Sequence, residues 1–149
     1  CPLPTQRASR AAPPWFGSLL MPLVLGAAGL LRGYKAATHW ASMDNLAYFG
    51  AEAVKTRVCV DRNRITGGGV TAGIDFGLVL ASKLSDSATA EKIQLYMEYN
   101  PEPPFDSGSP DSAPPAVLAA FNEMAKGMLT RRKEVTLRAS KQMDAFEKK

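Results

Sequence analysis

Few side chains of this 149-residue sequence suit nucleophilic or general-base chemistry. The cysteines are Cys1 and Cys59, and His39 is the only histidine. Cys59 stands between Val58 and Val60 in a β-forming stretch, where cysteine behaves as a small hydrophobic residue. We therefore expect Cys59 to be a buried strand residue, with a nucleophilic or redox thiol as the alternative. Nothing in the sequence near Cys1 would activate its thiol.

Two further features could take part in binding. His39 ends a short candidate strand, 35–39, which places it near the carboxyl edge of a sheet, where α/β proteins form ligand sites. It could act as a general base beside a nucleophile, but a hydrogen-bonded structural role is the simpler interpretation. Gly67–Gly69 form a sharp backbone bend, and Thr71 begins a helix whose first N–H groups could hold an anion or a polarised ligand. The alternative is a tight turn that only packs against a neighbouring helix.

Short strands that alternate with helices indicate an α/β fold with a mainly parallel sheet. Residues 1–18 carry four prolines and no helical or strand period, so we expect coil there. The 100–115 segment holds six of the 11 prolines and is expected to be a loop. The expected helices are 23–31 (ended by Gly33), 43–49 (capped by Ser42, closed by Gly50), 71–84, 88–99 and one from 115 or 116; the expected strands are 35–39, 57–61 and 65–66.

Two helices differ in the pattern of their apolar residues. The 71–84 helix is apolar nearly all round, which predicts that it is buried. The last helix has one apolar stripe at helical spacing, which consists of Val117, Phe121, Met124, Met128, Val135, Ala139, Met143 and Phe146.

Composition narrows the class of protein. Hydrophobic residues make up 46% and charged residues 21%, which fits one globular domain rather than a disordered chain. The net charge of +4 is mild, and the basic residues of the last helix alternate with acidic ones, so a solvated face is favoured over a nucleic-acid site. The apolar run 19–31 contains Pro22, Gly26 and Gly29 and is too short to span a membrane. Two cysteines favour a reducing cytoplasmic compartment.

Three segments, taken in order, carry a resemblance to a known family. They are 23–31 (LVLGAAGLL, followed by ATHWA at 37–41), 65–78 (ITGGGVTAGIDFGL) and 93–105 (IQLYMEYNPEPPF). Together they resemble the DJ-1/PfpI superfamily and, within it, the isocyanide hydratase branch. The resemblance implies a flavodoxin-like three-layer α/β sandwich that forms a homodimer, here incomplete at its N-terminal part. The implied division is a divergent coil over 1–22 and a DJ-1/PfpI-like domain over 23–149.

The same resemblance implies a site. In the family, a cysteine on a strand-to-helix turn attacks the isocyanide carbon, an upstream carboxylate assists, and an N-substituted formamide is released. That turn falls at residues 19–22 here, so Leu19 takes the place of the nucleophile, and no acidic residue precedes Asp44. We therefore expect no intact catalytic residue, with His39 and Cys59 as weak candidates. The residues expected to line the pocket are Thr38, His39, Gly68, Gly69, Val70 and Thr71.

The sequence thus predicts an isocyanide-hydratase-like protein that lacks the catalytic thiol. We expect no metal or cofactor, an isocyanide-like small-molecule ligand, a homodimeric partner, no nucleic acid or membrane, and a cytoplasmic location. The alternatives are a working isocyanide hydratase or related lyase, and a non-catalytic dimerisation or ligand-sensing module of the same superfamily.

Overall fold

The computed structural model of the chain describes residues 15–17 and 20–147. Its central sheet has three strands in the order β1-β5-β4. In this sheet β1 is parallel to β5, and β5 forms an antiparallel hairpin with β4. A second, two-stranded parallel sheet joins β2 and β3. The strands are β1 (Trp15–Gly17), β2 (Lys35–Ala36), β3 (Glu52–Ala53), β4 (Val58–Asp61) and β5 (Arg64–Gly67).

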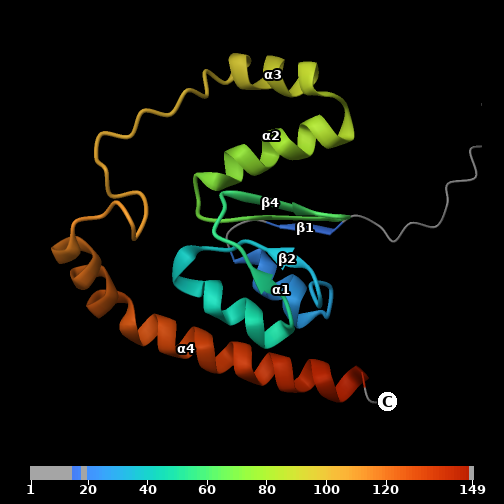
Figure 1. The fold of residues 1–149 in the computed structure, drawn as a ribbon, viewed down its shortest axis with the longest axis vertical. Helices are drawn as coiled ribbons and strands as arrows, with labels where there is room; N and C mark the ends of the chain where they lie inside the picture. The colour runs from blue at the N-terminus through green and yellow to red at the C-terminus, as the bar shows by residue number, and fades with distance from the viewer. Residues whose placement is uncertain (1–14, 18–19, 148–149) are drawn as a thin grey trace, which may run out of the picture.

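Helices lie on both sides of the sheets, which gives the predicted flavodoxin-like three-layer α/β arrangement around a small sheet (Figure 1). On one side α2 contacts β4 and β5 and leads into α3; on the other side α1 and a 3₁₀ helix, η1, pack together with α4 beneath them. The helices are α1 (Met21–Ala27), η1 (Trp40–Phe49), α2 (Ala72–Leu84), α3 (Ser87–Tyr96) and α4 (Pro115–Glu147). No helix among the described residues is long and apolar enough to cross a membrane.

The best-packed part of the core lies between α1, η1 and the β2–β3 sheet. Leu31 and Leu46 are fully buried there, and Phe49 is 1% exposed. Gly26 of α1 lies directly against Phe49, so that a Cβ atom at Gly26 would stand 2.4 Å from the Cδ2 atom of Phe49. Burying each of these large side chains contributes about 1.5–3 kcal/mol to folding, and the glycine permits the close approach of α1 and η1.

Hydrogen bonds join β2 to the hairpin β4–β5. The hydroxyl of Thr66, which is fully buried, accepts a hydrogen bond from the Ala37 amide at 2.9 Å. The carboxylate of Asp61 accepts one from the Lys35 amide at 2.8 Å. These bonds fix the end of β2 beside the end of β5, and the two segments that follow these strands therefore come together.

The prediction that residues 1–22 form coil is wrong for residues 15–17 and for the residues from Met21 on. Trp15–Gly17 pair with β5 as a strand, because the neighbouring strand supplies hydrogen-bond partners that no local pattern reveals. Helix α1 begins at Met21, earlier than predicted, and Pro22 is tolerated in its first turn. It also ends earlier, at Ala27, and Gly29 turns the chain with a φ of 74°.

The second predicted helix has a different start and cap. It is a 3₁₀ helix from Trp40, and the side chain of His39, rather than that of Ser42, caps it. Ser42 is instead buried, where its hydroxyl accepts a hydrogen bond from Arg132 of α4 at 2.7 Å. Gly50 closes the helix with a φ of 70°, as predicted.

The prediction that the 71–84 helix is buried is wrong. Ala72 is the only residue of α2 that is buried, and Leu84 is 73% exposed. One face of α2 lies on the sheet, and α3 packs against α2 but leaves most of its side chains only partly buried. The apolar stripe of α4 is likewise only partly covered, because Met143 is buried while Met124 is 77% exposed.

Candidate functional site

The six residues predicted to line a pocket all line one cavity of about 580 Å³. Thr38 and His39 come from the segment after β2, and Gly68 to Thr71 come from the bend between β5 and α2. Trp40 and Met43 of η1 add an apolar wall, and residues 55–57 and 108–111 complete the lining. The hydrogen bonds that join β2 to β5 therefore place the two predicted segments on the same cavity.

His39 is held in its neutral form. Its Nδ1 atom accepts a hydrogen bond from the Ala41 amide at 3.2 Å, and its ring lies 5.6 Å from that of Trp40. Burial, and secondarily the positive charge of Arg132, hold the pKa of His39 below its ordinary value. A Cβ atom at Gly69 would lie 3.8 Å from the imidazole Cδ2, an ordinary contact distance. The histidine is thus a structural cap that also forms part of the cavity wall.

This lowered pKa predicts a pH dependence of stability. Below pH 6.5 the unfolded chain protonates His39 while the folded chain resists, so the free energy of unfolding should fall as the pH falls below this value. His39→Asn keeps a capping acceptor but cannot titrate, so its stability should change less over this range. Urea unfolding of both proteins at several pH values measures the difference. Parallel pH profiles for the two proteins would show that His39 does not carry this dependence.

Two ion pairs hold the polar side of the cavity. Lys55 pairs with Asp111 and thereby joins the segment before β4 to the proline-rich loop. Arg57 pairs with Asp75 of α2, and the hydroxyl of Tyr99 donates a hydrogen bond to the same carboxylate at 2.6 Å. Burial opposes ionisation of Asp75, but the hydrogen bonds from Arg57 and Tyr99 outweigh it, and the net effect is a lowered pKa of Asp75. The carboxylate therefore stays charged and ties α2 to both neighbouring segments.

Cys59 takes no part in this cavity. It is a buried free thiol on β4, opposite Thr66 of β5, and it does not line the cavity. Burial and the nearby Asp61 raise the pKa of the Cys59 thiol, which opposes formation of the nucleophilic thiolate. Cys1 and Leu19 lie outside the described residues.

Sequence reasoning missed part of the cavity. Trp40 and Met43 lie close to His39 in the sequence, and the period of η1 could have indicated them. Lys55, Arg57 and the 108–111 loop reach the site through contacts between segments far apart in the sequence, for which no local signal exists. No group of three or more His, Cys, Asp or Glu side chains in the described part of the chain could hold a metal ion.

Comparison with known proteins shows which proteins the chain is similar to. Residues 20–83 match the model of the DJ-1/PfpI family. Over 122 residues the chain is 54% identical to isonitrile hydratase of Pseudomonas putida, a match that covers 82% of this chain and 54% of that protein. This part of the chain is similar to the DJ-1/PfpI family. It is also 33% identical over 81 residues to protein DJ-1 homolog A of Arabidopsis thaliana, which covers 54% of this chain and 21% of that protein.

The fold is similar to that of a solved protein of the same family. A crystal structure of a THiJ/PfpI family protein from Pseudomonas syringae superposes with a TM-score of 0.77 at 46% identity, over 84% of this chain and 50% of that one. The chain thus spans about half the length of these two bacterial relatives.

Proposed function

We propose that this chain is an isocyanide-hydratase-like domain that retains a ligand cavity of the DJ-1/PfpI fold but does not hydrate isocyanides. The observation that carries the proposal is that Thr38, His39 and the bend 68–71 line the same cavity. Identity of 54% to isonitrile hydratase supports an isocyanide or a related small, partly apolar molecule as the ligand. The low cysteine content supports a cytoplasmic setting.

The absence of turnover follows from the nucleophiles available. Hydration through a covalent intermediate needs a thiolate beside the substrate. Cys59 is buried away from the cavity, with its thiol pKa raised, and Leu19 stands where the resemblance puts the catalytic cysteine. His39 could accept a proton, but the described residues that line the cavity include no cysteine for it to activate.

Binding without turnover is testable at Gly69. A leucine side chain at Gly69 would project into the cavity, where a Cβ atom has ordinary contact room, so Gly69→Leu should weaken ligand binding at least about tenfold. Isothermal titration with phenyl isocyanide and with N-phenylformamide measures this. Gly77→Leu is the control, since a Cβ atom at Gly77 on α2 meets nothing within 4 Å. Equal binding by Gly69→Leu and the unmodified chain would show that this cavity is not the ligand site.

A dimerisation module is the alternative function, favoured by the apolar side chains exposed on α3 and after it. Leu95 is 83% exposed, Tyr96 92% and Phe105 78%, and surfaces of this kind usually contact another molecule. We expect sedimentation velocity to show a dimer or larger species whose proportion grows with protein concentration. A monomer at all concentrations, with a sharp unfolding transition at high temperature, would argue against self-association.

A further inference from the structure

A second cavity, of about 200 Å³, adjoins the candidate ligand cavity of about 580 Å³. The residues that line both cavities are Trp40, Gly108, Ser109 and Pro110. Trp40 is the first residue of η1, and the other three belong to the proline-rich loop that leads from α3 to α4 (Figure 1). Because these residues face both spaces, they form the partition between the two cavities.

The second cavity is mainly apolar where α4 lines it. Helix α4 contributes Val117, Leu118 and Phe121 to its wall. The hydroxyl of Ser109, on the loop side, is hydrogen-bonded to that of Ser112 at 3.1 Å. A space lined in this way suits an apolar group, such as an aromatic ring, better than a charged one.

The side chain of Trp40 is held in the partition by its neighbours. The cap that His39 forms with the Ala41 amide fixes the backbone at the start of η1. The indole ring lies 5.6 Å from the ring of His39, which lines the first cavity, and 5.1 Å from the ring of Phe121, which lines the second. The rings of Trp40 and Phe121 are tilted by 49°, a favourable arrangement for an aromatic pair, so α4 helps to hold the indole in place.

We infer that Trp40 is a specificity-determining residue, whose indole limits how far the apolar substituent of a ligand can extend toward α4. This inference rests on the proposed function, in which the cavity beside His39 and the bend 68–71 receives an isocyanide or a related small molecule. A substituent that extends toward α4 meets the indole and stops there. Without the indole the two cavities join, and a longer substituent can be buried against Val117 and Leu118.

The test compares phenyl isocyanide with 4-biphenylyl isocyanide, whose second ring is in line with the first, by isothermal titration of the full chain. We expect the unmodified chain to bind the two with affinities within about threefold of each other, because the second ring reaches no further apolar surface. Trp40→Ala should raise the affinity for the biphenylyl ligand relative to the phenyl ligand at least about tenfold, because the second ring becomes buried.

A milder variant covers the case in which Trp40→Ala does not fold. Trp40→Phe keeps a ring beside Phe121 but shortens the partition, so the same affinity ratio should rise at least about threefold. Circular dichroism of each variant confirms that its helices are retained.

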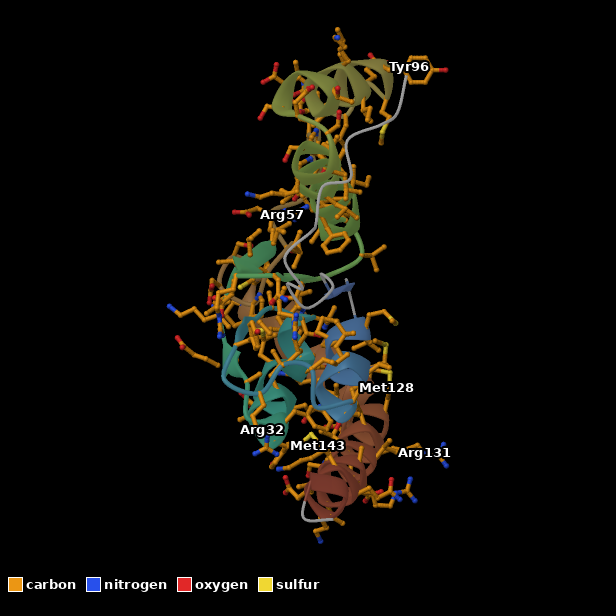
Figure 2. The ribbon with its side chains drawn as sticks, turned by 90° about the vertical axis from the view of Figure 1, so that its right-hand side faces the viewer. Arg32, Arg57, Tyr96, Met128, Arg131 and Met143 are labelled. Carbon is orange, nitrogen blue, oxygen red and sulfur yellow. The ribbon has the colours of Figure 1, made fainter. Side chains whose placement is uncertain are left out.

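Two further variants show where the second ring binds. Leu118→Trp, combined with Trp40→Ala, fills the second cavity with a new indole and should cancel the gain. Tyr96→Ala is the matched control for the loss of an aromatic side chain. Tyr96 is 92% exposed, lines neither cavity and lies at the end of α3, apart from Arg57 of the first cavity (Figure 2).

Two kinds of failure can be distinguished. If the unmodified chain binds neither ligand, the proposed function is wrong and the inference falls with it. If the unmodified chain binds phenyl isocyanide but Trp40→Ala and Trp40→Phe leave the affinity ratio unchanged, only the role of Trp40 is overturned. A gain that persists after Leu118→Trp would also overturn it, because the second ring would then bind outside the second cavity.

Discussion

Replacing Gly26 by alanine is expected to lower the free energy of unfolding by about 3 kcal/mol. Gly26 is buried on α1, and the added methyl group would stand 2.4 Å from Cδ2 and 2.7 Å from Cγ of Phe49. Phe49 is 1% exposed and cannot move away without opening the core between α1 and η1. The helices must therefore separate, and the packing of Leu25 and Leu46 is weakened with them.

The matched control for Gly26→Ala is the same change at a helical glycine with open space. A Cβ atom at Gly77 of α2 or Gly127 of α4 meets nothing within 4 Å. Alanine there should raise the free energy of unfolding by about 0.5–1 kcal/mol, because it reduces the freedom of the unfolded chain. Urea unfolding of the three variants measures the expected decrease in the free energy of unfolding for Gly26→Ala and the expected increase for the two controls. A Gly26→Ala protein as stable as the Gly77→Ala protein would contradict the close packing of α1 on Phe49.

The parts of the fold that local chemistry determines could be predicted from the sequence. Asp86 caps α3 by accepting a hydrogen bond from the Thr89 amide at 2.6 Å, and Gly50 closes η1 in a left-handed conformation. The hairpin around Asn63 and the long proline-rich loop also follow from residue type. Each of these features depends on residues only a few positions apart.

The predictions that are wrong concern segments whose structure depends on contacts with residues far away in the sequence. Residues 15–17 form a strand only because β5 pairs with them, and α2 is only partly buried although its sequence is apolar nearly all round. Apolar composition indicates that a surface is suited to burial, but it does not say which element covers it. The two predicted cavity segments lie together in the structure, whereas Lys55 and Asp111 reach the cavity through an ion pair between segments 56 residues apart.

The other prediction with a large expected effect concerns catalysis. We expect this chain to give no N-phenylformamide from phenyl isocyanide above the uncatalysed rate, while isonitrile hydratase from P. putida, assayed in parallel, turns the substrate over. The physical reason is that Leu19 has no nucleophilic atom and that the Cys59 thiol is buried away from the cavity. Leu19→Cys places a thiol where the resemblance puts the nucleophile, and turnover gained by this variant would show that the missing thiol accounts for the loss.

The most direct measurement is therefore formamide production by the unmodified chain, by Leu19→Cys and by the P. putida enzyme, followed by liquid chromatography under the same conditions. The account predicts product with the P. putida enzyme and none above background with the unmodified chain. Turnover by the unmodified chain that is lost in Cys59→Ser, Cys1→Ser or His39→Asn would contradict it and would assign the chemistry to that side chain.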